Sequence, residues 1–246
     1  MKEILEVIPL FFLDVFAFGL LWACFRLGRR FKDKLKWLYV LCIISGSSLL
    51  INQYCLYVKS ESILALLPLH LCYMAVWLIP IGLASRNTVL LDLIFYLCVP
   101  ASLLALLLPS NEFIAEPYSL LTLSFFLFHF LNVAIPILAS YWGVYDPAPS
   151  IKKAIRVSVT GLILTGVIHV VNLFIGAATG LRVNYFFTII EYSAPTNPAY
   201  QFLGSLIPFD YVYLWPGLLV LYVNMGVVYA VRSYRRYRKR TSDVAS

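Results

Sequence analysis

Seven apolar runs dominate this sequence, and each is close to the ~20 residues that an α-helix needs to cross the hydrocarbon core of a bilayer. The expected spans are residues 7–27, 37–58, 63–84, 89–108, 118–142, 157–178 and 211–231. Hydrophobic residues make up 61% of the chain and charged residues 13%, far from a typical soluble domain. Because a backbone in lipid must satisfy its own hydrogen bonds, we predict an all-α polytopic membrane bundle, with residues 1–246 as a single transmembrane domain.

Basic residues are distributed unevenly between the two sides of these spans. Short cytoplasmic loops retain Lys and Arg, and this bias sets the orientation of a membrane protein. One side carries Arg26, Arg29, Arg30, Lys32, Lys34, Lys36, Arg86, Lys152, Lys153, Arg156, Arg232, Arg235, Arg236, Arg238, Lys239 and Arg240. The other side carries Lys2, Lys59 and Arg182. We therefore expect the N-terminus outside and the C-terminus in the cytoplasm.

The net charge of +7 follows from the same bias. The tail segment RRYRKR, at residues 235–240, is expected to lie against anionic lipid headgroups, because such lipids attract basic segments next to a membrane. The charge therefore indicates topology and lipid contact, and nucleic acid is not an expected partner. The oligomeric state stays open.

The five cysteines stand singly within the expected spans. They are Cys24, Cys42, Cys55, Cys72 and Cys98. They form no CxxC pattern and no paired spacing outside the membrane, so neither a disulfide framework nor a zinc site is predicted. We expect no metal and no cofactor. Four of the five are expected to be small apolar packing residues, and Cys72 is the exception.

Polar side chains inside the spans fall into one layer. Ionisable groups are costly in a bilayer, so several of them in one region indicate a function. At ~1.5 Å of rise per helical residue, one group lies ~9–11 Å and a second ~13–17 Å below the outer surface. The shallower group is Asp14, Asn52, His70 and Asn172, and the deeper group is Cys72, His129 and His169. Five spans thus contribute to this layer, which we interpret as a shared cavity that opens outward.

Two histidines of this layer are each followed by an asparagine three residues later. His129 precedes Asn132 in the pattern HFLN, and His169 precedes Asn172 in HVVN. Residues three apart share one face of a helix, so each pair points in one direction. Hydrogen bonding between helices is the alternative role, and it contributes ~0.6 kcal/mol per contact in membranes on average.

Cys72 and His129 have the chemistry of a nucleophile and its base. A histidine can generate a thiolate, which attacks an ester and forms a covalent acyl-enzyme. In a regular helix His70 points ~200° away from Cys72, so both face one centre only if Pro68 distorts that turn. His70 is otherwise expected to orient a headgroup, donate to an oxyanion or contact a neighbouring helix.

Four short segments resemble a known family. They are LPLHLC (67–72), FHFLN (128–132), HVVN in the sixth span and NYFF (184–187), followed by a Pro-rich loop and an aromatic last span. Together they resemble the YwaF-like bacterial integral membrane family, a relative of animal transmembrane protein 164. In the animal relative, a cysteine on one span and a histidine on a later one support acyl transfer onto ether lysophospholipids without acyl-CoA. The matching positions are Cys72 as nucleophile and His129 as base, and the resemblance implies the bacterial plasma membrane.

The leading hypothesis is a CoA-independent acyltransferase, or transacylase, that moves a fatty acyl group between phospholipids or lysophospholipids of the outer leaflet. The residues expected to contact substrate are His70, Asn132, His169, Asn172, Asn184 and Tyr185. A phospholipase that uses the same residues is the close variant. A non-enzymatic transporter or small-molecule binding protein is the competing class. Broken helices at the midplane would favour it. The sequence has no clear inverted repeat and no deep carboxylate pair, which counts against it.

Overall fold

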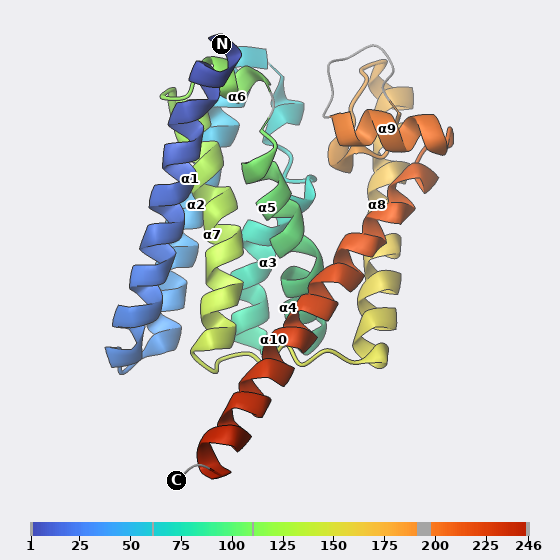
Figure 1. The fold of residues 1–246 in the computed structure, drawn as a ribbon. Coiled ribbons are helices and arrows are strands. Elements are labelled where there is room, and N and C mark those ends of the chain that lie inside the picture. Colours follow the sequence, from blue (N-terminus) through green and yellow to red (C-terminus); the bar gives the residue numbers. More distant parts are fainter. Residues whose placement is uncertain (1, 61, 110, 191–197, 245–246) are drawn as a thin grey trace.

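The computed structural model describes residues 2–60, 62–109, 111–190 and 198–244, and all regular secondary structure in them is helical (Figure 1). The α-helices are α1 (Lys2–Leu27), α2 (Lys34–Ser60), α3 (Leu71–Ser85), α4 (Thr88–Leu93), α5 (Val99–Leu107), α6 (Asn111–Ala115), α7 (Leu120–Tyr141), α8 (Ile151–Thr179), α9 (Pro198–Leu206) and α10 (Leu218–Val244). Shorter turns are η1 (Gly28–Arg30), η2 (Ile63–Leu66), the π-helical η3 (Ile94–Cys98), η4 (Tyr185–Phe187) and η5 (Val212–Gly217). The predicted helical class is confirmed.

Five helical segments of the described chain are long and apolar enough to cross a membrane. They are Lys34–Ser60, Thr88–Leu107, Leu120–Tyr141, Ile151–Thr179 and Val212–Arg238. Two shorter apolar stretches, Val15–Arg26 and Leu71–Ser85, lie within the expected first and third spans. The structure therefore supports a polytopic membrane protein, and the expected count of seven spans and the orientation stay predictions.

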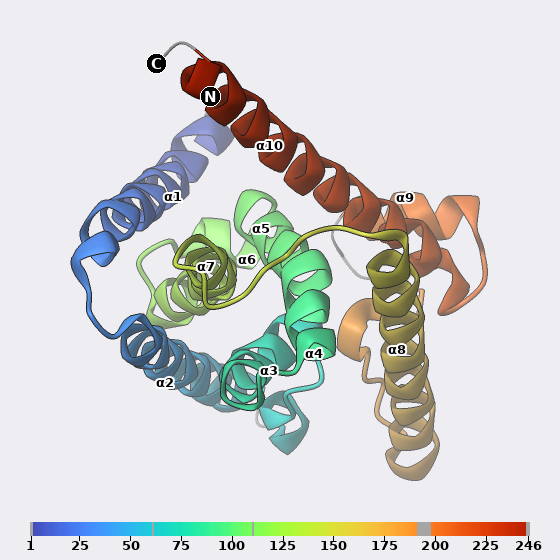
Figure 2. The same cartoon turned by 90° about the horizontal axis from the view of Figure 1, so that it is seen from below.

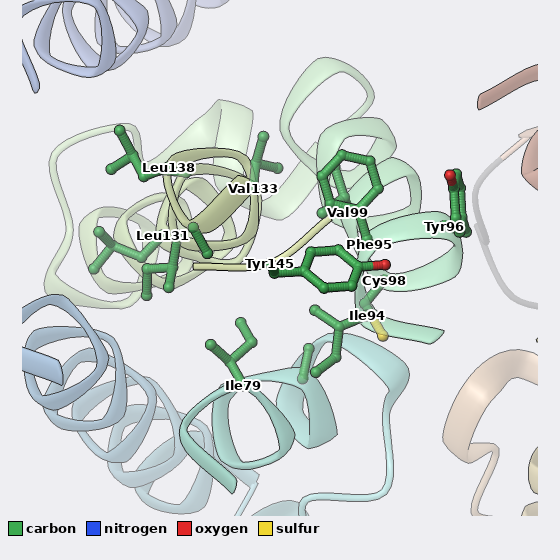
Figure 3. Packing of buried hydrophobic residues seen from close by; sticks show 14 of the residues in the cluster. Ile79, Ile94, Phe95, Tyr96, Cys98, Val99, Leu131, Val133, Leu138 and Tyr145 are labelled. Carbon is green, nitrogen blue, oxygen red and sulfur yellow. The ribbon is translucent and has the colours of Figure 1, made fainter. Parts of the chain in front are cut away.

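Helix α7 forms the centre of the bundle. Figure 2 shows it enclosed by α1, α2, α3 and α5, with α8 and α10 farther out. Of its apolar stretch 72% is buried, against 22% for α8 and 11% for Val212–Arg238. The core between α3, η3 and α7 is filled by branched side chains such as Ile79, Ile94 and Leu131 (Figure 3). The exposed apolar faces of α8 and α10 are suited to lipid contact.

The third expected span, 63–84, is not one continuous helix, so that prediction is wrong for residues 63–70. Residues 63–66 form the short turn η2, and α3 begins only at Leu71. Between them Leu67 (φ −73°, ψ 123°) and His70 (φ −78°, ψ 145°) are extended. Pro68 explains the break, because it lacks an N–H group and disfavours helical geometry at the preceding residue. Length and hydropathy alone do not show such an interruption.

The last expected span, 211–231, is shifted along the chain. Val212–Gly217 form a 3₁₀ turn that contains Pro216, and the regular helix α10 starts at Leu218 and continues through the basic segment to Val244. The fourth span contains the π-helical turn η3, in which the N–H group of Val99 donates to the carbonyl oxygen of Ile94. A carbonyl of this turn, that of Phe95, accepts a hydrogen bond from Asn224 Nδ2 of α10 at 3.0 Å.

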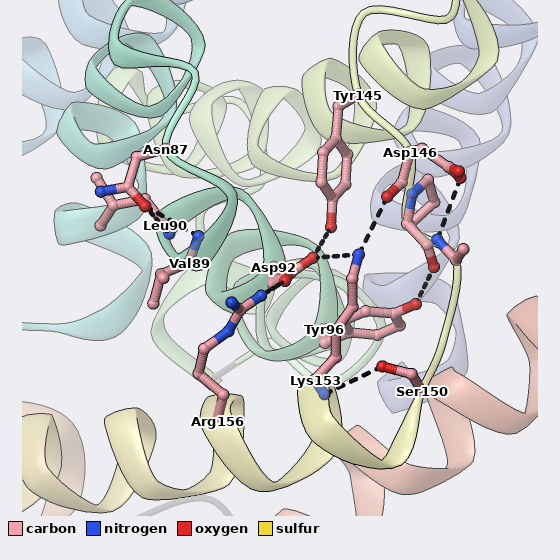
Figure 4. A network of polar contacts seen from close by, with 12 residues as sticks. Asn87, Val89, Leu90, Asp92, Tyr96, Tyr145, Asp146, Ser150, Lys153 and Arg156 are labelled. Atoms are coloured by element: carbon pink, nitrogen blue, oxygen red, sulfur yellow. Dashed lines mark hydrogen bonds and ion pairs between the residues drawn. The ribbon is translucent and has the colours of Figure 1, made fainter.

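A buried carboxylate joins three segments at the end of the bundle that holds the loop 142–150 (Figure 4). Asp92 of α4 is fully buried, and Lys153 Nζ of α8 lies 2.8 Å from its Oδ1. Arg156 and the hydroxyl of Tyr145 also donate to this carboxylate. Asp92 therefore connects α4, the loop and α8.

Candidate functional site

Cys72 lies in the first turn of α3. His70 is the N-cap residue, its side chain makes no capping hydrogen bond, and its carbonyl oxygen accepts from Met74 N at 2.9 Å. The first N–H groups of an α-helix have no partner within the helix, and this end carries partial positive charge. Both features stabilise a thiolate. Burial in an apolar bundle has the opposite effect, so ionisation of Cys72 requires a base.

Polar groups from two other helices surround Cys72. Asn132 of α7 donates through Nδ2 to the Cys72 carbonyl oxygen at 2.8 Å. The hydroxyl of Ser102, on α5, lies beside the Cys72 thiol. Asn132 Oδ1 and Ser102 Oγ are buried without a hydrogen-bond partner of standard geometry in the described chain. The surroundings of Cys72 therefore retain unused hydrogen-bonding capacity.

His129 lies on α7 one turn before Asn132, the residue that contacts Cys72. It is three residues from Asn132, so the two side chains share a face, and His129 lies one turn nearer to the start of the helix. Its Nδ1 is 2.8 Å from the carbonyl oxygen of Phe125. A carbonyl oxygen only accepts, so Nδ1 carries the proton and Nε2 holds the lone pair of the neutral ring. Within the described residues Nε2 makes no hydrogen bond, which suits a general base.

His70 has the opposite tautomer. Its Nδ1 accepts a hydrogen bond from the backbone N–H group of Phe186 at 3.2 Å, so the neutral ring carries its proton on Nε2. The ring contacts Tyr73, Tyr185 and Phe187, with centroids 5.4, 5.7 and 5.4 Å away. The structure thus provides one histidine that accepts a proton and one that donates a hydrogen bond.

The expected separation of ~200° between His70 and Cys72 does not apply, because it assumed that both residues lie in one regular helix. His70 precedes α3 and is extended, as Pro68 allows. The angular separation of a regular helix therefore does not prevent His70 and Cys72 from acting at one site.

The remaining expected site residues hold the segment 184–188 against α8. Asn172 donates through Nδ2 to Tyr185 O and Thr188 Oγ1, both at 2.8 Å, and its Oδ1 accepts from Tyr185 N at 3.0 Å. His169 Nδ1 lies 3.2 Å from the same threonine oxygen. Asn184 makes two hydrogen bonds to the backbone of Ile189. These three side chains and the Thr188 hydroxyl position the segment, and His70, at the start of α3, contacts it through Phe186 N.

Segment 184–188 is strained where it meets His70. Phe186 and Phe187 have positive φ values of 61° and 54°, which are uncommon for residues with a side chain. The conformation is held from both ends, because the Tyr185 hydroxyl donates to Leu64 O at 2.6 Å and the Tyr213 hydroxyl donates to Phe187 O. Strain of this kind persists only when neighbouring contacts maintain it.

The expected polar layer is present as two connected groups. Asn132 of α7 meets Cys72, and the segment 184–188 meets His70. Asn52 joins the layer through Tyr73, whose hydroxyl donates to Asn52 Oδ1 at 3.3 Å. The side chain of Asp14 lies outside the described part of the structure. Sequence reasoning missed Ser102 and Thr188, because a single hydroxyl in an apolar span carries no motif.

Comparison with known proteins identifies the family. The model of the TMEM164 family matches residues 3–231, which is nearly all of the chain. The chain belongs to the TMEM164 family. This confirms the resemblance drawn from LPLHLC, FHFLN and NYFF, and every residue of the layer lies within the matched region. No curated protein and no solved structure matches the chain.

Family membership and the apolar helices together make this TMEM164-family protein an integral membrane protein. All five cysteines are free thiols. Among the described residues, no group of three or more His, Cys, Asp or Glu side chains is placed to hold a metal ion.

Proposed function

We propose that this TMEM164-family protein is a membrane-embedded transacylase that moves a fatty acyl group between phospholipids and lysophospholipids through a thioester on Cys72. The observation that carries the proposal is the contact between α3 and α7, where Asn132, on the same face as His129, holds the carbonyl oxygen of Cys72 at 2.8 Å. A thiol in the first turn of a helix, next to the face that carries a histidine base, is a recurring arrangement for acyl transfer.

In the first half-reaction, Nε2 of His129 takes the proton of the Cys72 thiol, and Sγ attacks the carbonyl carbon of a phospholipid ester. A C–S bond forms and the ester C–O bond breaks. The proton on His129 passes to the leaving glycerol oxygen, which gives a lysophospholipid. The oxyanion that forms in between would accept hydrogen bonds from Nε2–H of His70 and from the first-turn N–H groups of α3.

In the second half-reaction, the hydroxyl of an acceptor lysophospholipid gives its proton to His129 and attacks the thioester. A new ester forms and the Cys72 thiol is regenerated, so no oxidant, reductant or acyl-CoA is consumed. If water replaces the acceptor, the same steps release a fatty acid and the protein acts as a phospholipase. Ser102, beside the thiol, would donate to Sγ when it is negatively charged.

We infer that the site serves the outer leaflet of a bacterial plasma membrane, with the tail at 235–240 against anionic headgroups of the inner leaflet. The remaining residues of the layer, namely His169, Asn172, Asn184 and Tyr185, would act on substrate by positioning the segment that contacts His70.

The test uses purified protein, a diacyl phospholipid with a labelled acyl chain, and an unlabelled lysophospholipid acceptor. Cys72→Ala should abolish transfer of the label, and His129→Ala should slow it by about 10²–10⁴-fold, the usual contribution of a general base. Cys55→Ala is the matched control, because Cys55 is also a partly buried free thiol. Equal rates in the wild type and Cys72→Ala would overturn the proposal and favour a transport or binding function, and Cys72-dependent release of free fatty acid would identify the lipase.

A further inference from the structure

A cavity of about 390 Å³ lies beside His70, where the C-terminal end of α2, the connector before α3 and the turn η4 meet. Leu56, Leu67 and the rings of Tyr73 and Tyr185 give it a mainly apolar wall. Leu67 is exposed, so the cavity opens at the surface of the helical bundle. The volume lies within the range of small-ligand sites, about 300–1,000 Å³, and suits part of a lipid molecule.

Most polar groups on this wall already have partners. The Ser60 hydroxyl donates to a backbone oxygen of α2 at 2.8 Å, and the Tyr185 hydroxyl donates to one of η2 at 2.6 Å. The Tyr73 hydroxyl donates to Asn52 Oδ1 at 3.3 Å. Lys59 also has an interaction partner. We therefore assign recognition of a ligand to none of these four wall residues.

His70 is different, because one of its donors is uncommitted. Its Nδ1 accepts from Phe186 N at 3.2 Å, so Nε2 carries the proton, and this N–H group has no hydrogen-bond acceptor among the described residues. The rings of Tyr185 and Phe187, with centroids 5.7 and 5.4 Å away, hold the imidazole in place. A donor beside an apolar wall costs free energy until it is paired, so a ligand that brings an acceptor oxygen is favoured.

An acyl ester on a glycerolipid matches both features of the cavity. Its carbonyl oxygen is a neutral acceptor for the Nε2–H group of His70, and its chain suits the leucine and tyrosine side chains of the wall. The bilayer around an integral membrane protein supplies such esters directly. A lipid with an alkyl ether in place of the ester has the same chain but no carbonyl oxygen, so it would fill the cavity and leave the N–H group unpaired.

We propose that this cavity is a binding site for the acyl ester group of a glycerolipid, in which the Nε2–H group of His70 donates to the ester carbonyl oxygen. The site therefore prefers ester-linked to ether-linked chains. Its role as the place where the acyl donor waits for Cys72 rests on the proposed transacylase function, whereas binding itself does not. A lysophospholipid and a simple fatty ester share this chemistry, and the experiment distinguishes them.

Binding is measured in the Cys72→Ala background, so that turnover plays no part. The probes are an acyl lysophosphatidylcholine with a fluorophore at the end of its chain and the alkyl ether counterpart with the same headgroup and label, both in neutral detergent. The parent should bind the ether about tenfold more weakly than the ester, as expected when one donor is left unpaired. His70→Phe should bind the ester about tenfold more weakly than the parent does and the ether as before.

His70→Gln keeps an N–H donor near the position of Nε2 and should restore the preference for the ester. Tyr57→Phe is the matched control, because it removes an exposed hydroxyl of α2 that lies outside the cavity wall. Damage to the fold in a His70 variant would weaken binding of both probes, whereas loss of the donor weakens binding of the ester alone.

Displacement of the ester probe by a fatty acid methyl ester would assign the site to the ester and its chain, and displacement by unlabelled lysophospholipid alone would assign it to the whole lipid; both results support an ester site. Equal affinity of the parent for the two probes, or an ester preference that persists in His70→Phe, would overturn the proposal. A His70-dependent ester preference without Cys72-dependent transfer would refute the transacylase and leave the site standing. Cys72-dependent transfer without that preference would refute the site alone.

Discussion

The buried carboxylate of Asp92 is predicted to stabilise the fold, and Asp92→Asn tests this role. The substitution keeps the shape of the side chain but removes its charge and gives it an NH₂ group. In one orientation of the amide this group faces Arg156, and in the other it faces Lys153 and the Tyr145 hydroxyl; all three partners are donors. Burial, assisted by the hydrogen bond to Asp92, raises the pKa of Tyr145, so its hydroxyl stays protonated and continues to donate. The amide would therefore place donors opposite donors.

The expected loss of folding free energy in Asp92→Asn depends on how exposed Lys153 and Arg156 are. Removing one member of a buried ion pair costs about 3–5 kcal/mol, because the remaining charge is left without a counter-charge. The side chains of Lys153 and Arg156 are 20% and 39% exposed, so water compensates both cations in part. We therefore expect Asp92→Asn to lower the free energy of unfolding by about 3 kcal/mol, the lower end of this range. For a chain of this size that loss corresponds to a fall in Tm of about 6–12 °C.

A thiol-reactive fluorophore measures this unfolding directly, because Cys98 is fully buried and Cys42 nearly so in the folded protein. Asp146→Asn is the control: its side chain is 67% exposed and pairs with Arg232, and exposed pairs contribute less than about 1 kcal/mol. The reasoning is refuted if Asp92→Asn changes Tm by no more than Asp146→Asn does.

Three further results are expected. A lipid-like electrophile should label Cys72 in preference to Cys42 and Cys98, and this selectivity should be lost in His129→Ala; mass spectrometry of labelled peptides measures it, and equal labelling of every cysteine would count against the nucleophile. Asn172→Leu removes three hydrogen bonds to segment 184–188, so unfolding should require about 2–3 kcal/mol less and acyl transfer should slow, whereas an unchanged Tm would contradict the positioning role. The hydrogen bond from Arg232 holds the pKa of Asp146 below its ordinary value. This contact therefore stabilises the protein above about pH 4, and its contribution is lost as the pH falls through the lower pKa of the folded state. The decrease in Tm below about pH 4 should be smaller in Asp146→Asn than in the wild type.

Much of the candidate site could be predicted, because its residues are chemically conspicuous in an apolar chain. Similar depth predicts Cys72, His70, His129 and Asn172, and the spacing in HFLN adds Asn132. The structure connects α3, α7 and segment 184–188 through hydrogen bonds of Asn132, Asn172 and His70. Depth along a helix follows from residue number alone, so one sequence is enough to estimate it.

The partners of these residues could not be predicted in the same way. Nothing in the order of residues indicates that Phe125 O would fix the tautomer of His129, or that Phe186 N would fix that of His70. The position of Ser102 beside Cys72 depends on how α5 packs after the π-helical turn, and hydropathy does not register such a turn.

The sequence by itself determined the helical membrane class, the family and the layer of polar residues, because apolar length, charge bias and short motifs are local properties of the chain. Only the tertiary structure decided that His70 turns toward segment 184–188 and that this segment is held in a strained conformation. These features arise from contacts between segments more than a hundred residues apart, such as Tyr185 with Leu64 and Phe186 with His70. Their geometry depends on how the helices pack, which no local pattern encodes.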